Sequence, residues 1–119
     1  MEDYKLGMIE SRFADIIWQN EPITTKELVD RCAMELNWKR TTTYTVLKKL
    51  CEKGFFQTEG RTVTSLVSKL EYNSIQSEKF VEETFSGSLP ALVVAFGSRK
   101  KLSEKEIEEL QKVIDSMRG

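Results

Sequence analysis

Apolar residues recur at helical spacing near the start of the chain, where they predict two helices. The first group of apolar positions is Ile9, Phe13, Ile16 and Ile17. Side chains three and four positions apart share one face of a helix, so this group predicts a first helix over about residues 10–19. A second helix is predicted over residues 25–36. It starts after Thr24, which has the spacing of a capping box with Glu27.

Residues 39–53 predict a third helix with two different faces. Gly54 follows this helix, and glycine is the usual residue where a helix ends in the left-handed conformation. At about 100° per residue the side chains divide into two groups. The first group consists of Thr43, Val46, Leu47 and Leu50. The opposite group is polar and consists of Thr41, Tyr44, Thr45 and Lys48. We expect the first face to pack and the second to remain free.

Two β-prone runs follow, at residues 55–58 and 62–67. They flank Glu59-Gly60-Arg61, so they predict a β-hairpin. Three helices followed by a hairpin indicate a winged helix-turn-helix domain over residues 1–70. The fold class is therefore mainly α with a small β-hairpin. In such a domain the second helix of the helix-turn-helix, here residues 39–53, enters the major groove of DNA.

The sequence after the predicted hairpin indicates further helices, whose apolar faces need a surface to pack against. A fourth helix is expected over residues 70–85, then a short apolar segment over 89–96 and an exposed connector over 97–101. Ser103 and Glu106 form a second capping box, which starts a last helix. Its apolar positions are Ile107, Leu110, Val113, Ile114 and Met117. These residues could pack on their own domain, but the winged helix already closes its core. We therefore assign residues 71–119 as a helical dimerisation region.

Charge is distributed unevenly along the chain, although the net charge is only -1. Residues 1–35 have a net charge of -4, residues 36–70 of +5, and residues 71–119 of -2. A basic band inside an acidic chain is typical of a local site for a polyanion. The band coincides with the predicted third helix and hairpin, so we expect double-stranded DNA as its partner.

The polar face of the third helix supplies the candidate DNA contacts. Hydroxyl, phenol and ammonium groups can reach phosphates and base edges, and threonine methyls can contact thymine. Three consecutive threonines are poor helix formers, so we favour recognition over a merely solvated face. Arg40 and Arg61 are assigned to the phosphate backbone, although Gly60-Arg61 would also suit an ordinary exposed turn.

Composition argues against an enzyme. The chain has no histidine, and no phosphate-binding glycine loop, so we expect no catalytic residues, no metal and no cofactor. Cys32 and Cys51 lie in apolar helical patterns and are assigned to the core as free thiols. Trp18 and Trp38 are assigned to the core rather than to base stacking. No apolar run reaches the ~20 residues of a membrane span, and the acidic start does not resemble a signal peptide, so we expect a cytosolic protein without membrane insertion.

The chain resembles a known family, the penicillinase and methicillin-resistance repressors with their copper-responsive relatives (the BlaI, MecI and CopY type). The matching segments extend over nearly the whole length and include Ile16-Ile17-Trp18, Thr24, Lys26-Glu27-Leu28, Thr42, Thr45, Leu50, Lys53-Gly54, Phe85-Ser86-Gly87-Ser88-Leu89, Leu92-Val93, Phe96, Leu102-Ser103 and Glu106-Ile107-Glu108-Glu109-Leu110. The resemblance implies a homodimeric repressor that binds palindromic operators. It also implies inactivation of the resistance branch by cleavage in the C-terminal region, triggered by a membrane sensor-protease pathway.

Two departures from the family pattern change what the resemblance implies. The copper branch has paired cysteines near its C-terminus, and residues 115–119 of this chain contain none. The resistance branch is cut at an Asn-Phe bond, and the aligned pair here is Ala95-Phe96, the expected position of any cleavage. Two other functions remain as alternatives, namely a winged helix that binds protein and a winged-helix regulator controlled by a small ligand or metal.

Overall fold

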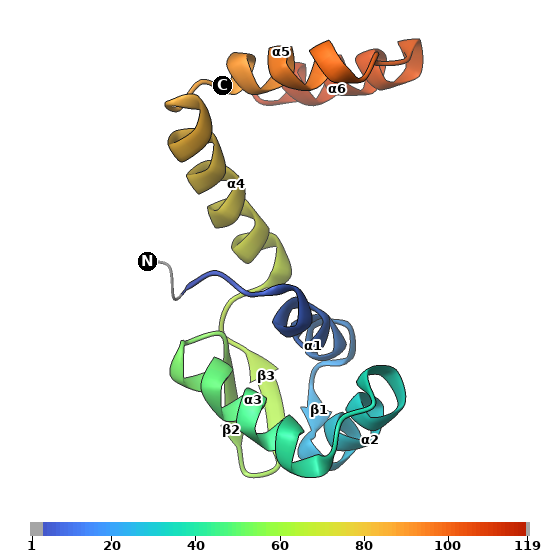
Figure 1. Ribbon diagram of the computed structural model, residues 1–119, viewed down its shortest axis with the longest axis vertical. Coiled ribbons are helices and arrows are strands. Elements are labelled where there is room, and N and C mark those ends of the chain that lie inside the picture. Colours follow the sequence, from blue (N-terminus) through green and yellow to red (C-terminus); the bar gives the residue numbers. More distant parts are fainter. Residues whose placement is uncertain (1–3, 119) are drawn as a thin grey trace. The chain divides into compact units, whose positions relative to one another are not determined.

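The computed structural model describes residues 4–118, which form six helices and three short strands (Figure 1). They fall into two compact units, one extending to Gln76 and the other starting at Ser77. The boundary lies inside helix α4 (Lys69–Phe85) and not in a loop. No helix in this described part is long and apolar enough to cross a membrane.

Three helices of the first unit have the order and almost the bounds that the sequence predicts. They are α1 (Met8–Asn20), α2 (Thr25–Leu36) and α3 (Arg40–Glu52). The capping box of α2 is present, since the Thr24 hydroxyl accepts a hydrogen bond from the Glu27 N–H at 3.1 Å. In return the Glu27 carboxylate accepts one from the Thr24 N–H at 3.2 Å. Asn37, in the left-handed conformation with φ 57°, ends the helix.

The end of α3 also follows the prediction. Gly54 has a φ of +90°, a backbone conformation that residues with a Cβ atom rarely adopt. Its N–H donates to the Cys51 carbonyl, and the Phe55 N–H donates to the Leu50 carbonyl, both at 3.0 Å. This pair of hydrogen bonds is the Schellman arrangement, which satisfies the last carbonyls of the helix and turns the chain toward the sheet.

The first unit contains a small antiparallel sheet of three strands. They are β1 (Ile23–Thr24), β2 (Phe56–Glu59) and β3 (Thr62–Ser65), in the order β1-β3-β2. Strands β2 and β3 form the predicted hairpin, which we call the wing, with Gly60-Arg61 as its turn. Strand β1, which lies between α1 and α2, was not predicted because two residues are too few to establish an alternating pattern.

The core lies between the helices and the sheet. Its fully buried side chains come from α1 to α3 and from the three strands with their flanking residues, and include Phe13, Ile17, Ile23, Leu28, Leu50, Phe55, Phe56 and Val63. Trp18 and Trp38 are half-buried and pack against this core, which confirms their assignment. The Trp18 indole donates a hydrogen bond to the Val67 carbonyl at 2.9 Å, and the Trp38 ring stacks on Phe13 with 5.5 Å between centroids.

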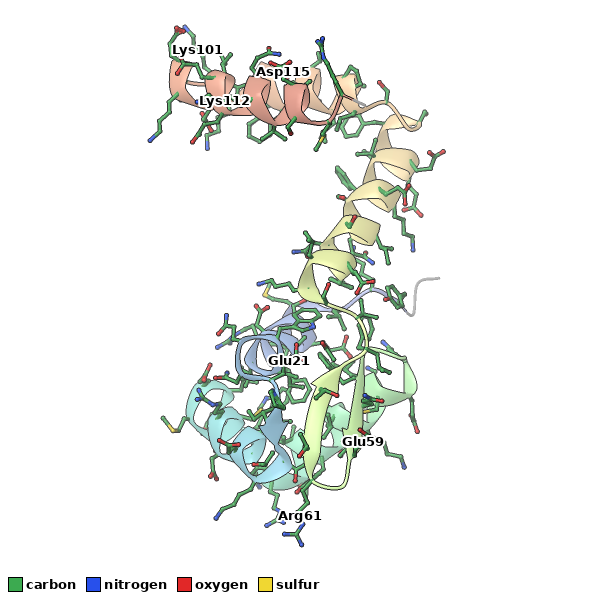
Figure 2. All side chains as sticks on the ribbon, turned by 180° about the vertical axis from the view of Figure 1, so that it is seen from behind. Glu21, Glu59, Arg61, Lys101, Lys112 and Asp115 are labelled. Atoms are coloured by element: carbon green, nitrogen blue, oxygen red, sulfur yellow. The ribbon has the colours of Figure 1, made fainter. Side chains whose placement is uncertain are left out.

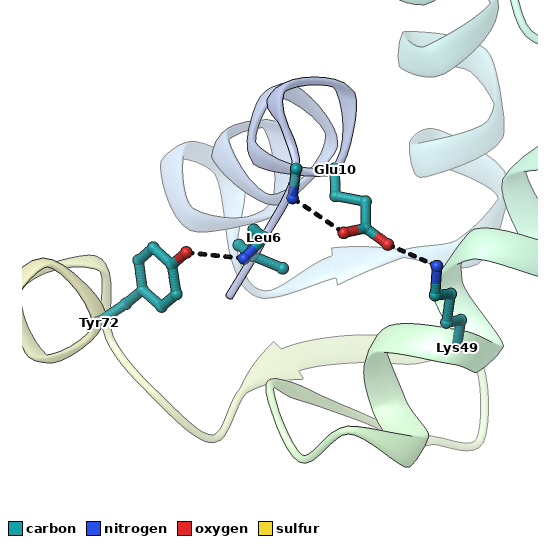
Figure 3. Close-up of polar contacts among 5 residues, drawn as sticks. Leu6, Glu10, Lys49 and Tyr72 are labelled. Carbon is teal, nitrogen blue, oxygen red and sulfur yellow. Dashed lines mark hydrogen bonds and ion pairs between the residues drawn. The ribbon is translucent and has the colours of Figure 1, made fainter. Parts of the chain in front are cut away.

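Three polar contacts hold the segment around the start of α1 in place (Figure 3). The backbone N–H of Leu6 donates a buried hydrogen bond to the Tyr72 hydroxyl at 2.8 Å. The Glu10 carboxylate accepts a hydrogen bond from the Gly7 N–H at 3.0 Å and forms an ion pair with Lys49 of α3 at 2.9 Å. The first turns of α4, which carry Tyr72, thus belong to the same packed unit as α1.

The second unit consists of the end of α4 together with α5 (Leu89–Arg99) and α6 (Glu104–Ser116). The Ser103–Glu106 capping box of α6 is present. The prediction of an exposed connector over residues 97–101 was wrong in part, because α5 continues to Arg99. Glycine lowers the stability of a helix by about 1 kcal/mol without forbidding it, so Gly97 and Ser98 do not end this one.

Candidate nucleic-acid interface

The two faces of α3 differ in burial as the sequence predicts. Thr43, Leu47 and Leu50 are buried, and Val46 is half-buried. On the other side all the candidate contact residues are exposed, namely Arg40, Thr41, Tyr44, Thr45 and Lys48. This exposed side is called the polar face below. Because the core holds one side of α3 in place, the polar face is carried on a rigid support.

Two contacts order the side chains of the polar face. The guanidinium carbon of Arg40 lies 5.6 Å from the centroid of the Tyr44 ring, which is within the range of a cation–π interaction. The Thr45 hydroxyl donates a hydrogen bond to the Thr41 carbonyl, one turn earlier, at 2.9 Å. Both contacts restrict rotation of exposed side chains before any ligand arrives.

Ion pairs account for only part of the basic band. Lys49 pairs with Glu10 as described, and Lys69 pairs with Asp15 at 2.9 Å. Over residues 4–118, no ion pair involves Arg40, Lys48 or Arg61. Arg40 and Lys48 on the polar face and Arg61 at the wing are therefore among the basic groups of the band that have no counter-charge in this part of the chain.

Glu10 is held as a carboxylate by its surroundings. The hydrogen bond from the Gly7 N–H lowers the pKa of Glu10, and the ammonium group of Lys49 lowers it further. Burial opposes both effects but is weaker. The ion pair between α1 and α3 is consequently formed at neutral pH, and it ties the helix that carries the polar face to the rest of the unit.

Arg61 lies at the tip of the wing, where its side chain is exposed and points away from the rest of the unit (Figure 2). Its backbone is nevertheless fixed. The Thr25 N–H, at the start of α2, donates a hydrogen bond to the Arg61 carbonyl at 2.9 Å. The wing thus presents an exposed charged side chain on an anchored backbone.

The other end of strand β3 has a second anchor. The Glu21 carboxylate accepts hydrogen bonds from the N–H of Ser65 at 2.8 Å and from its hydroxyl at 2.9 Å. Glu21 and Thr25 lie on either side of strand β1. The central strand of the sheet is therefore held at both ends by the segment that joins α1 to α2.

A hollow of about 470 Å³ lies between α3 and the wing. Its lining residues are Thr25, Tyr44, Leu47, Lys48, Cys51, Thr58 and Gly60. The structure therefore brings Tyr44 and Lys48 to the same surface as the wing turn that contains Arg61. Sequence reasoning did not single out Thr25 or Thr58, because only the fold places them beside α3.

The cysteines are both free. Cys32 is buried, as expected, and burial raises the pKa of its thiol to about 11. Cys51 is only half-buried, because it lines the hollow as well as packing on the core, and burial raises the pKa of its thiol too. In the described part of the chain no cluster of three or more His, Cys, Asp or Glu residues could hold a metal ion.

The second unit exposes much apolar surface. The five residues assigned to dimerisation, Ile107, Leu110, Val113, Ile114 and Met117, are 43–76% exposed. A hollow of about 450 Å³ lies between α5 and α6, and its lining is apolar except for Glu106 and Glu109. Such continuous apolar exposure is unusual for an isolated unit and is typical of an interaction surface.

Ala95 and Phe96 lie inside α5 and not in a flexible link. Both are exposed, and Phe96 also lines the hollow between α5 and α6. Their carbonyls are engaged, since the Ser98 hydroxyl donates to that of Ala95 at 2.8 Å and the Lys100 N–H to that of Phe96 at 3.1 Å. A protease would have to unwind this part of α5 before reaching the bond.

Comparison with known proteins gives consistent matches. The family model described as penicillinase repressor matches residues 6–116. The chain is 26% identical to the methicillin resistance regulatory protein MecI of Staphylococcus aureus, with 94% of each chain covered. It is 28% identical to a penicillinase repressor of Bacillus licheniformis, with 84% of this chain and 81% of the relative covered. A penicillinase repressor of Staphylococcus aureus is 21% identical, with 95% of this chain and 93% of the relative covered.

Proposed function

The chain belongs to the penicillinase repressor family, a family of transcriptional repressors and not of enzymes, and on that premise we propose that it represses transcription by occupying operator DNA as a homodimer. The observation that carries the proposal is the polar face of α3. Among the described residues its basic groups Arg40 and Lys48 form no ion pair, and it borders the same hollow as the wing turn. Occupying an operator requires no catalytic step, and it places the protein in the cytoplasm with its DNA.

Each group at this surface has a distinct role in the proposal. Helix α3 enters the major groove, where Thr41, Tyr44, Thr45 and Lys48 face the base edges. Arg40 and Arg61 neutralise phosphates, Arg40 from the start of α3 and Arg61 from the wing. The anchored backbone of the wing supports this role, because a phosphate contact positions the protein only if the contacting group is held in register.

The homodimer follows from the apolar surface of the second unit. Residues Ile107, Leu110, Val113, Ile114 and Met117 of α6 and its end would be buried against the same surface of a second copy. Two-fold symmetry then matches a palindromic operator, and the linked pair of reading helices binds more tightly than either alone. We accordingly assign residues 1–70 to DNA binding and 71–119 to dimerisation.

Cleavage at Ala95-Phe96 would reverse repression. A cut there separates α6 from the DNA-binding unit and removes the tether that keeps two reading helices together. The helical setting of this bond means that cleavage by a protease of a membrane sensor pathway requires local unwinding first. The test is a fragment map from cells under inducing conditions, in which intact repressor would contradict this step.

One alternative rests on a specific observation. The apolar hollow between α5 and α6 has a volume typical of small-molecule sites, so a small apolar ligand could control the protein instead of proteolysis. A protein-binding winged helix is disfavoured, because the polar face lies in a basic band and combines hydroxyls with basic groups that form no ion pair among the described residues, a pattern typical of a polyanion site.

The decisive experiment measures DNA binding as a function of salt. Duplexes that the full chain selects from a random-sequence pool provide the probe. For roughly 6–10 phosphate contacts, affinity is expected to fall about 10³–10⁵-fold between about 50 and 200 mM salt. Arg61→Ala should weaken binding to all sequences, whereas Thr45→Ala should reduce the preference for the selected one. A flat salt dependence, or equal effects of both substitutions on both kinds of DNA, would contradict the proposal.

A further inference from the structure

We propose that Thr45 recognises thymine through its methyl group and not through its hydroxyl. This inference rests on the proposed function, because it requires α3 to lie in the major groove. It assigns to one residue of the polar face both a contacting atom and a preferred base.

The Thr45 hydroxyl is already engaged within the helix. Its proton lies in the 2.9 Å hydrogen bond to the Thr41 carbonyl, so it is not available to acceptors on a base. Thr43 makes a similar bond to the Lys39 carbonyl at 3.4 Å, but Thr43 is buried. Thr45 therefore combines an internally bonded hydroxyl with an exposed position on the reading side of α3.

The methyl group is what remains to contact DNA. The Cβ atom of threonine carries two heavy substituents, and here the oxygen is directed back along the helix. The methyl is thus the free apolar group of this exposed side chain. In the major groove thymine presents a C5 methyl group, which is the apolar partner that such a side chain fits.

A hydroxyl that donates one hydrogen bond can still accept another. In that case Thr45 would accept from the amino group of adenine or cytosine, and the methyl would be incidental. Two substitutions separate these cases because each removes one substituent of Cβ. Thr45→Val keeps the methyl and loses the hydroxyl, whereas Thr45→Ser keeps the hydroxyl and loses the methyl.

The experiment combines these variants with DNA that lacks single methyl groups. A duplex that the full chain selects from a random-sequence pool is prepared with each thymine replaced in turn by deoxyuridine, which removes only the C5 methyl. Burial of one such group is worth about 0.8 kcal/mol, which corresponds to roughly fourfold in affinity per half-site. Replacing the symmetric thymine in both half-sites should thus lower the affinity roughly 15-fold.

For the unmodified chain we expect this loss at one thymine in each half-site and little change at the others. Thr45→Val should bind the thymine duplex within about twofold of the unmodified chain and remain sensitive to deoxyuridine at the same place. Thr45→Ser should bind roughly fourfold more weakly per half-site and lose that sensitivity. Circular dichroism and thermal unfolding check that both variants keep the fold.

Two results would overturn the inference. One is full affinity of Thr45→Ser together with loss of binding by Thr45→Val, which would assign the contact to the hydroxyl. The other is an unmodified chain that tolerates deoxyuridine at every position. Neither result affects the proposed function, whereas failure to select any duplex from the pool would overturn both.

Discussion

The backbone N–H of Leu6 donates its hydrogen bond to the hydroxyl of Tyr72, 66 positions later in the chain, at a distance of 2.8 Å. The bond is buried, so no water replaces it when it is lost (Figure 3). It joins the segment before α1 to the first turns of α4, both of which belong to the first unit.

Tyr72→Phe is therefore expected to destabilise the first unit by about 1–3 kcal/mol, because it leaves a buried N–H without a partner while the ring stays in place. Chemical denaturation followed by circular dichroism measures this. The matched control is Tyr44→Phe, which removes a hydroxyl from an exposed tyrosine and should change stability by no more than about 0.5 kcal/mol. Equal effects of the two substitutions would contradict the role of the buried bond.

The ion pair between Glu10 and Lys49 predicts that the stability of the first unit decreases as the pH falls into the acidic range. The lowered pKa of Glu10 means that its contribution is present above the pKa of the unfolded chain and is lost as the pH falls through the folded value. Glu10→Gln should thus lower stability by about 0.5 kcal/mol at pH 7, since Lys49 is largely exposed.

This difference between Glu10→Gln and the unmodified chain should shrink as the pH falls below about 4.5. Lys49→Gln should give a similar loss, and the double substitution should cost less than the sum of the two. A difference that is constant from pH 7 to pH 3 would show that Glu10 acts through its shape and not through its charge.

The hydrogen bond from Thr25 to Arg61 predicts that the start of α2 controls the wing. Thr25 is the first residue of α2, where proline fits a helix because the N–H has no partner within the helix. Thr25→Pro therefore removes the donor to the Arg61 carbonyl and leaves α2 intact. We expect DNA binding to weaken roughly tenfold, as it should for Arg61→Ala, because the wing loses its anchor.

Thr25→Ala is the control, since it keeps the N–H and should bind DNA normally. The double variant Thr25→Pro, Arg61→Ala should bind no more weakly than Arg61→Ala alone, because both substitutions act through one contact. Additive losses measured by fluorescence anisotropy would mean that Thr25 affects binding independently of the wing.

The apolar face of α6 predicts that a single charged substitution in this helix weakens the dimer. Ile114→Lys places a charge where the proposed interface buries an isoleucine, once in each chain. The expected loss is about 1.5–3 kcal/mol per chain, so the dissociation constant should rise roughly 100-fold or more. Glu108→Lys changes a charge outside the assigned apolar positions of α6 and serves as the control. If analytical sedimentation gave the same dimer dissociation constant for both variants, the interface would have to lie elsewhere.

Much of this fold follows from local sequence signals. Helix α2 has the predicted bounds because Thr24 and Glu27 define its start and Asn37 its end. The division of α3 into two faces follows directly from helical geometry. The Gly-Ser pair at 97–98 was misleading for α5, since two weak helix breakers do not end a helix when the surrounding residues support it.

The parts that could not be predicted depend on contacts between distant residues. The Glu21 carboxylate meets Ser65 across 44 positions, and the Thr25 N–H meets Arg61 across the sheet. Neither contact has a local pattern, and strand β1 exists mainly because β3 is there to pair with it. The sequence therefore indicates which side chains could touch DNA, but not how the backbone that carries them is held.

The separation of the two faces of α3 has a consequence for how such a protein can change. Thr43, Leu47 and Leu50 determine whether the helix stays folded against its core, while Thr41, Tyr44, Thr45 and Lys48 contribute nothing to that core. Exposed substitutions of this kind usually alter stability by less than about 0.5 kcal/mol each. The residues of the polar face can thus be exchanged as a set, by natural drift or by design. Under the proposed function, such an exchange retargets one scaffold to new operators without any change to its core.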